Sequence, residues 1–553
     1  MDETPFVFDR NRLVNLTTEQ LTLESVARYA QDAARFAQET DNFAHDTKDH
    51  LDQLQGWLDI LWLLLGAYLV FFMQAGFALL EAGSVRAKNT KNILLKNILD
   101  ACLGAVVWWV FGYPFAYGGP YEQDDRNAFI GAGTNFAMAD HAQINGSFYA
   151  TWMFQWAFAA TAGTIVSGAV AERCDFRAYL VYTCVITGFT YPVIAHWGWS
   201  SEGWLSPFRE PSRIIGGNGL IDFGGSAIVH MGGGGAALMA SIFLGPRLGR
   251  FDVNGDVVDM PGHSTVLAAL GTFILWFGWY GFNPCSTLAI KYMNIAQRVA
   301  VTTTLSAAAG GSTCLGIHVA LGNPPDVSPA LNGILAGLVG ITGACPVVQP
   351  WVALIIGMIA APIYMCSSHG LKRLQIDDPL DAAPVHFCCG MWGTLAVGLF
   401  ADKGLTLETY GLYEEGYGIF MGGDGVQLGV QILAIVVIAL WSCSTSAVMF
   451  YCLKRLGILR VPNDDELKGL DLTHHGGSAY TFDRTGKFFS QHGMEKSSSQ
   501  LNSWVAPMET GIVHNGEPTT NGLYNTGGDA KIKLTPAPPP HLSTPNQVVP
   551  DGF

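Results

Sequence analysis

The chain has 553 residues, of which 49% are hydrophobic and only 14% are charged, and its mean hydropathy is positive. Soluble domains carry about a quarter charged residues, so this composition excludes an ordinary soluble protein and indicates an integral membrane protein. The formal net charge of −15 argues against nucleic acid as a partner, because nucleic-acid-binding domains present clustered basic residues.

The first 55 residues come before any long apolar run. The first twenty are acidic and polar, so no cleavable signal peptide is expected. Residues 18–55 place apolar side chains at helical spacing. These are Val26, Tyr29, Ala33, Phe36, Phe43, Leu54 and Trp57, interrupted by Thr40, Thr47 and His50. We predict that residues 1–55 form an extracellular segment with a candidate amphipathic helix, which either lies solvated on the protein or associates with another copy.

Eleven runs of mostly apolar residues follow, each near the length of about twenty residues that a helix needs to cross a bilayer. They lie at 57–83, 97–118, 147–171, 178–198, 223–245, 263–284, 298–321, 330–348, 351–368, 384–401 and 426–453. Pro346 and Pro350 crowd the end of the eighth run. The sequence therefore predicts an all-α membrane protein with eleven transmembrane helices between residues 56 and 455.

Basic residues gather in alternate short loops, after the first, third, fifth, ninth and last runs. They are Arg86, Lys88, Lys91, Lys96, Arg173, Arg177, Arg247, Arg250, Lys372, Arg373, Lys454, Arg455 and Arg460. Cytoplasmic loops carry the excess of Lys and Arg in membrane proteins. Because eleven is odd, this pattern predicts an extracellular N-terminus and a cytosolic C-terminus.

Two segments match each other five runs apart. Asp222 to His230 opens the fifth run and Asp378 to His386 opens the tenth, and both read Asp, seven residues, then His after Val. An odd repeat unit makes the two halves run in opposite directions, and an inverted repeat of five helices places a substrate site between the halves near the midplane.

The two histidines of this repeat have two interpretations. Each could bond a backbone carbonyl as an ordinary core residue, but two ionisable groups at matching membrane positions favour function. Asp222 is interpreted as a structural residue, because a carboxylate at a helix start accepts free N–H groups.

The run from Ala67 to Gly118 resembles the first two spans of plant-type ammonium transporters of the Amt/Mep/Rh family. It includes Gly-Phe-Ala-Leu-Leu-Glu-Ala-Gly-Ser-Val-Arg-Ala-Lys-Asn-Thr from Gly76 to Thr90. Further matching segments are Gln155–Phe158, Ala171–Arg173, Tyr191–Trp199, Asp222–His230, Trp276–Pro284 and Asp377–His386. They follow the family's order over roughly residues 57–477.

The resemblance implies a site for ammonium, with methylammonium as its analogue. Phe158, Trp199 and Ser286 correspond to the outer recruitment site, and Phe158 and Phe282 to the stacked gate. His230 and His386 correspond to the twin pore histidines, and Asp222 to the acid beside the recruitment site. The family also implies a homotrimer with one pore in each subunit, nitrogen uptake across the plasma membrane, and no cofactor, metal or enzymatic activity.

Three residues depart from the family's pattern. Cys285 and Phe387 stand where glycine is usual, and Glu81 is a charge in the first span where plant members are neutral. Arg86 is the expected partner of Glu81. These departures bear on rate and packing more than on substrate.

Residues 456–480 are predicted to form a cytosolic regulatory segment. Asp464 to Gly477 resembles the family's tail, which docks on the neighbouring subunit, and Thr473 corresponds to a phosphorylated threonine of plant members. Its alternative is an ordinary exposed threonine. Residues 481–553 are rich in Ser, Asn, Gly, Thr and Pro, and we expect them to be disordered.

The sequence therefore predicts a transporter that recruits NH4+ at an aromatic site, deprotonates it and conducts it through a hydrophobic twin-histidine pore. Rival interpretations are an ammonium sensor that transports little, a Rhesus-type gas channel, which Trp199 disfavours, and an intramembrane metallohydrolase. The last lacks a His-Glu-x-x-His motif and a third ligand in register with the histidines.

Overall fold

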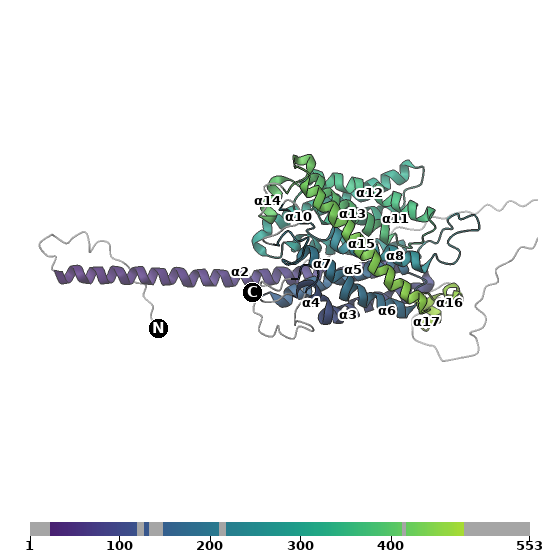
Figure 1. Ribbon diagram of the computed structural model, residues 1–553, viewed down its shortest axis with the longest axis horizontal. Coiled ribbons are helices and arrows are strands. Elements are labelled where there is room, and N and C mark those ends of the chain that lie inside the picture. The colour runs from purple at the N-terminus through teal and green to yellow at the C-terminus, as the bar shows by residue number, and fades with distance from the viewer. Residues whose placement is uncertain (1–22, 119–126, 132–146, 210–216, 412–415, 481–553) are drawn as a thin grey trace, which may run out of the picture. The chain divides into compact units, whose positions relative to one another are not determined.

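The computed structural model describes residues 23–118, 127–131, 147–209, 217–411 and 416–480. The described elements are helices, and all of them belong to one unit (Figure 1). They are α2 (Leu23–Ser84), α3 (Thr90–Val107), α4 (Tyr113–Tyr117), α5 (Phe148–Val170), α6 (Phe176–Val185), α7 (Tyr191–Trp199), α8 (Gly232–Leu244), α9 (Thr265–Phe282), α10 (Met293–Ala320), α11 (Val327–Thr342), α12 (Pro350–Arg373), α13 (Cys389–Phe400), α14 (Lys403–Tyr410), α15 (Val426–Arg455), α16 (Asn463–Lys468) and α17 (Leu470–His474). The prediction that residues 481–553 are disordered lies outside the described residues.

Each of the eleven predicted runs coincides with a helix or with helical segments in direct succession. Among the described residues, nine helices are long and apolar enough to cross a membrane. The other two runs coincide with α10, which is rich in Thr, Ser and Gly, and with α11, which has only 16 residues. The structure therefore shows an all-helical membrane protein with nine candidate spans.

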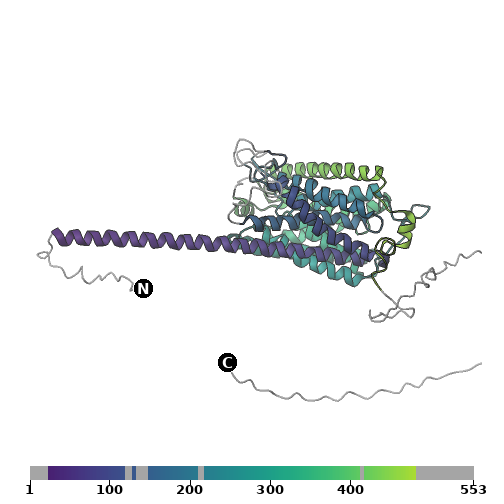
Figure 2. The same cartoon turned by 90° about the horizontal axis from the view of Figure 1, so that it is seen from below.

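The first helix is longer than predicted. α2 continues without a break through the expected boundary at residues 55 and 56, and its N-terminal part extends beyond the other helices (Figures 1 and 2). Phe43 is 72% exposed and Trp57 is 60% exposed. The interpretation of residues 18–55 as a helix lying on the protein is therefore wrong, while its association with another copy stays a prediction.

Small residues let the helices approach closely. α10 packs against α11 and α12, and α2 packs against α9. A Cβ on Gly310 of α10 would lie 2.3 Å from the carbonyl oxygen of Gly333 on α11, and one on Gly271 of α9 would lie 2.3 Å from the backbone nitrogen of Leu80 on α2. Membrane helices associate by such backbone contact, because lipid provides no hydrophobic drive between them.

In the described part of the chain, four of the candidate spans contain a π-helical turn. These turns are η2 (Trp108–Gly112), η6 (Ile186–Thr190), η7 (Ser226–Met231) and η10 (Ala383–Cys388). η7 carries His230 and η10 carries His386, so both matching segments of the sequence begin their helix in the same unusual conformation. π-helical turns are rare and occur frequently at functional sites.

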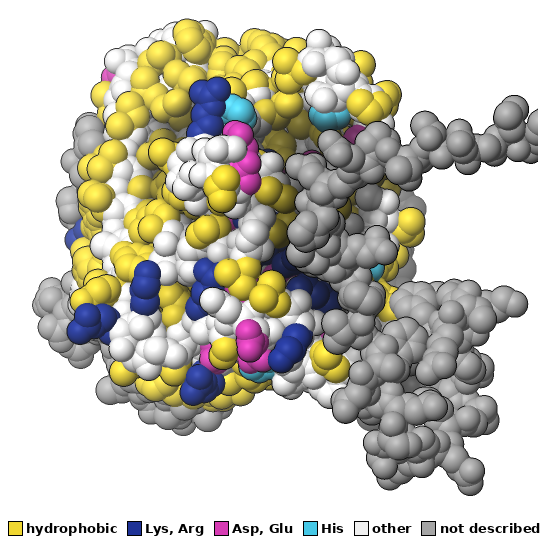
Figure 3. All heavy atoms as spheres, turned by 90° about the vertical axis from the view of Figure 1, so that its right-hand side faces the viewer, with side chains coloured by type: hydrophobic (Ala, Val, Ile, Leu, Met, Phe, Trp, Pro, Cys, Tyr) yellow, Lys and Arg dark blue, Asp and Glu magenta, His cyan; other side chains and the backbone are white. Residues whose placement is uncertain are grey.

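The end of the helical unit that carries α16 and α17 is rich in basic side chains (Figure 3). Asp377 lies here, in the loop after α12, and accepts hydrogen bonds from Arg247 at 2.8 and 3.0 Å. Burial opposes ionisation of Asp377, but Arg247 and Arg173 hold the pKa of its carboxyl below the usual range. The basic loops predicted from the sequence therefore gather at one end and are tied together by buried acids.

Candidate functional site

An aromatic cavity of about 430 Å³ opens beside the start of η7. Its wall includes Phe158, Trp199, Ser286 and Asp222. The rings of Phe158 and Trp199 meet edge to face, with centroids 5.8 Å apart. The indole nitrogen of Trp199 donates to the Asp222 carbonyl oxygen at 2.8 Å, and the Ser286 hydroxyl donates to the Phe282 carbonyl oxygen at 2.7 Å. The cavity therefore presents ring faces and hydroxyl lone pairs, which suit a small cation.

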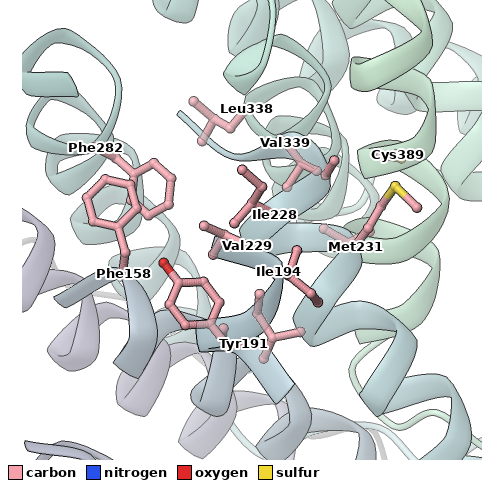
Figure 4. Close-up of a cluster of buried hydrophobic side chains, with 14 of the residues drawn as sticks. Phe158, Tyr191, Ile194, Ile228, Val229, Met231, Phe282, Leu338, Val339 and Cys389 are labelled. Atoms are coloured by element: carbon pink, nitrogen blue, oxygen red, sulfur yellow. The ribbon is translucent and has the colours of Figure 1, made fainter. Parts of the chain in front are cut away.

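Two stacked rings lie next to this cavity. Phe158 and Phe282 are 1% and 0% exposed, and their ring centroids are 4.1 Å apart at an interplanar angle of 28°. They come from α5 and α9, and Figure 4 shows them face to face beside the apolar side chains of the η7 segment. Together they separate the aromatic cavity from the histidines beyond.

His230 and His386 meet behind these rings. Their Nδ1 atoms are 3.2 Å apart and their rings are nearly parallel, at 15°. His230 also stacks on Phe282, with centroids 5.5 Å apart, and both imidazoles are buried. A hydrogen bond between two Nδ1 atoms requires one ring to donate and the other to accept, so the two histidines must hold different tautomers.

Asp222 shapes the start of η7. Its Oδ2 accepts the backbone N–H groups of Ala227 and Ile228 at 3.0 and 2.8 Å. Gly225, at the turn between them, has a φ of 102°, which favours glycine. Asp378 repeats the arrangement at η10, where its Oδ2 accepts the N–H of Ala383 at 2.7 Å. The two carboxylates thus satisfy the free N–H groups of two histidine-bearing helices.

A second, much smaller cavity of about 30 Å³ lies on the other side of the histidine pair. We name it the carboxylate cavity, because Glu81 lines it together with His386 and Phe77. Phe77 faces His386, whereas Phe282 of the stacked pair faces His230, so the histidine pair lies between the two cavities. The sequence analysis identified Glu81 only as a departure from the family's pattern and not as a site residue. A charged residue within an apolar run is the sequence feature that could have pointed to this cavity.

The expected pairing of Glu81 with Arg86 is wrong. Arg86 binds Glu172, both through its backbone N–H and through its guanidinium group. Glu81 instead accepts from the Asn97 amide at 2.7 Å and contacts the Ser167 hydroxyl. Glu172 follows α5 and has the conformation (φ 71°) that turns its carboxylate toward the arginine.

The other two departures are packing residues in this structure. Cys285 is 1% exposed, and a Cβ on Gly66 would lie 2.5 Å from its Cβ. The backbone nitrogen of Phe387 would lie 2.4 Å from a Cβ on Gly234. Within the described part of the chain, neither residue is among those that line the two cavities.

The segment after α15 docks on its own chain. The Asp471 carboxylate accepts the N–H groups of Lys91 and Asn92, at 3.0 and 2.9 Å, and so caps the start of α3. The Lys88 ammonium donates to the Glu466 carbonyl oxygen at 2.9 Å. Thr473 is half-buried and its hydroxyl donates to the Gly469 carbonyl oxygen. The resemblance implied docking on a neighbouring subunit, and the structure adds these contacts within one chain.

Known proteins are similar to this chain in sequence. The Ammonium Transporter Family pattern matches residues 61–480. Ammonium transporter 1 member 3 of Solanum lycopersicum is 43% identical over 438 residues, which cover 76% of this chain and 93% of that protein. Ammonium transporter 3 of Dictyostelium discoideum is 42% identical over 434 residues, covering 78% of this chain and 96% of that protein.

Solved structures agree with this assignment. A protein described as a sensor Amt protein superposes with a TM-score of 0.69 at 34% identity, covering 77% of this chain and 100% of that chain. Mep2 of Candida albicans gives a TM-score of 0.65 at 28% identity, covering 74% of this chain and 87% of that chain. The chain therefore belongs to the ammonium transporter family, a family of membrane transport proteins rather than enzymes.

Proposed function

We propose that the protein recruits NH4+ in the aromatic cavity, removes its proton and conducts ammonia past the stacked rings and the twin histidines. One observation carries this proposal: the hydrogen-bonded pair His230 and His386 lies directly behind the stacked pair Phe158 and Phe282. This order provides a cation site, an apolar barrier and a polar, proton-exchanging pair in succession.

Removing the proton of NH4+ costs less free energy than moving the charged ion through the apolar region between the cavity and the histidines. Moving a charge through an apolar region of a membrane protein costs on the order of 10 kcal/mol. Removing the proton of an amine whose pKa lies a few units above neutrality costs about 3–4 kcal/mol. The faces of Trp199 and Phe158 attract the cation, with up to ~2 kcal/mol when it is desolvated. Na⁺ and K⁺ have no proton to release, so the same barrier rejects them.

The histidine pair can carry the proton. In the tautomers that the Nδ1–Nδ1 hydrogen bond requires, one ring donates and the other accepts, and exchanging these roles moves a proton between them. The Nε2 of His230 is buried and has no hydrogen-bond partner among the described residues. An arriving ammonia molecule or water would satisfy it.

The same proposal covers topology and assembly. We propose that α10 and α11 complete eleven spans, arranged as an inverted five-helix repeat, in a homotrimer at the plasma membrane. The basic end with α16 and α17 faces the cytosol, in keeping with the positive-inside rule, and the N-terminus is extracellular (Figure 3). Phosphorylation of Thr473 would add about two negative charges and undock the tail.

A second candidate function is ammonium sensing with little transport. The observation that favours it is the superposition on a solved structure described as a sensor Amt protein. Growth on low ammonium of a yeast strain without its own ammonium carriers separates the two functions. A transporter restores growth, whereas a sensor that transports little leaves the strain starved.

Electrical recording with His230→Ala and His386→Ala tests the proposed mechanism. We expect each variant to lose most of the ammonium current or its selectivity over K⁺, because the proton-exchanging pair is broken. His369→Ala is the matched control, since His369 is an exposed histidine at the end of α12. Currents and selectivity equal to the wild type in both pore variants would overturn the proposal.

A further inference from the structure

The carboxylate cavity places a buried acid beside one of the two stacked histidines. Its lining combines His386 with apolar side chains of Phe77, Leu80 and Val385 and one carboxylate, Glu81. About 10–15 Å³ of such space is enough for one water molecule, so a cavity of about 30 Å³ admits a water or an ammonia molecule. A single small molecule can therefore lie between the imidazole and the carboxylate.

Glu81 is a buried acid that forms no ion pair with the residues that the structure describes. It is only 2% exposed. Arg86, five residues along the chain, is engaged by Glu172. The nearby Lys96 ammonium instead donates to the Cys174 carbonyl oxygen at 3.0 Å and lies over the ring of Tyr179.

The two partners that Glu81 does have are neutral. Its Oε2 accepts from the Asn97 amide, and its Oε1 contacts the hydroxyl of Ser167, which also donates to the Thr164 carbonyl oxygen at 2.6 Å. A buried carboxylate with only neutral partners is costly to keep ionised, and binding a proton relieves that cost. The surroundings therefore favour a group that takes up and releases a proton.

We propose that Glu81 is the proton-exchanging residue at the far end of the route. Its carboxylate receives the proton that the histidine pair relays, and the resulting carboxylic acid returns it to ammonia in the carboxylate cavity. This inference rests on the proposed function and assigns it a residue that the family resemblance does not supply.

The proton balance closes for one substrate. NH4+ in the aromatic cavity breaks one N–H bond, and its proton enters the histidine pair while ammonia crosses the gate. His386 then releases a proton through a water in the carboxylate cavity to the Glu81 carboxylate, which forms an O–H bond. Ammonia reaching the cavity takes that proton and leaves as NH4+, so the carboxylate is restored and one charge crosses for each ammonium.

A second buried acid provides a matched control. Asp100, on α3, accepts from the hydroxyl groups of Tyr179 and Thr183, and Thr164 lies at 3.4 Å from its Oδ2. Asp100 is buried close to Glu81 but is not among the described residues that line the carboxylate cavity. The titratable groups facing Glu81 are thus Lys96 and Asp100 on α3 and His386 on η10.

The test measures current and methylammonium uptake in the same cells for the full-length protein. For Glu81→Gln, which keeps an amide oxygen toward Asn97, we expect the charge carried per methylammonium to fall about tenfold or more, because the proton acceptor is gone. Glu81→Asp should keep charge movement with an altered pH dependence. Asp100→Asn should keep the wild-type ratio of charge to substrate.

Three outcomes are decisive. A wild-type ratio in Glu81→Gln at every pH would overturn the role of Glu81 while leaving the proposed function intact. If Glu81→Gln does not reach the cell surface, Ser167→Ala replaces it as the test, since it removes a neighbour of the carboxylate but not the carboxylate itself. A wild-type pH dependence of the charge carried per methylammonium in both Ser167→Ala and Glu81→Asp would then refute the role of Glu81. Absence of current and uptake in the wild type would instead refute the proposed function.

Discussion

The aromatic cavity and the carboxylate cavity differ in size and in chemistry. The first has about 430 Å³ and is lined by rings, including Phe158 and Trp199, whereas the second has about 30 Å³ and is lined by apolar side chains, His386 and Glu81. A hydrated cation fits the first and only one small molecule fits the second. Under the proposed function, ring faces select the cation on one side, and a carboxylate handles its proton on the other side.

The two cavities also depend on different structural elements. The aromatic cavity stands at a helix start that Asp222 caps, so its shape depends on a buried hydrogen-bonded turn. The carboxylate cavity lies between η10 and α2, which carries Glu81. Asn97 on α3 fixes the Glu81 carboxylate by a hydrogen bond. Changes at the first should alter substrate binding, and changes at the second should alter charge movement.

The largest effect is expected for Asp222→Ala. It leaves the N–H groups of Ala227 and Ile228 without their acceptor, which should lower the free energy of unfolding by about 2–3 kcal/mol. If the functional conformation of η7 is destabilised by the same free energy, methylammonium uptake falls about a hundredfold. Thermal unfolding and methylammonium uptake measure the two quantities. Asp222→Asn, which keeps an acceptor oxygen, is the control, and wild-type uptake in Asp222→Ala would break the proposed dependence.

A smaller effect is expected for Trp199→Leu. Loss of the cation–π attraction of ~2 kcal/mol corresponds to an increase in KM for methylammonium of about thirtyfold. Trp199→Phe keeps a ring face and should raise KM less. The charge carried per substrate should stay at the wild-type value in both variants, because the carboxylate cavity is unchanged. A changed ratio of charge to substrate with an unchanged KM would contradict the assignment of substrate binding to the aromatic cavity and of charge movement to the carboxylate cavity.

The smallest effect is expected at the basic end. Asp471→Ala removes the cap of α3, a loss of about 1 kcal/mol, and should increase undocking of the tail about fivefold. Trypsin cleavage after the exposed Lys468 reports that undocking. Because α3 also carries Asn97, maximal current should change while KM at the aromatic cavity stays constant. Equal cleavage rates for Asp471→Ala and Asp471→Asn would show that the cap does not hold the tail.

Local patterns accounted for the helices and for most of the candidate site. Apolar runs located each of the nine candidate spans among the described residues, because hydropathy and length act within one segment. The repeated Asp and His spacing singled out His230 and His386, and the two Nδ1 atoms are in fact 3.2 Å apart. Continuity was harder to predict: Thr40, Thr47 and His50 interrupt the apolar pattern but not the helix, so α2 continues from Leu23.

The membrane class, the helical runs and the family could be predicted from the amino-acid sequence, since these depend on composition, periodicity and motif order. The pairing of charged side chains could be established only from the packed helices. Arg86 lies five residues from Glu81 in the sequence but pairs with Glu172, 86 residues away. Glu81 therefore lines the carboxylate cavity beside His386 without an arginine partner. The physical reason is that an ion pair depends on distance and burial in space, and chain separation specifies neither once helices pack.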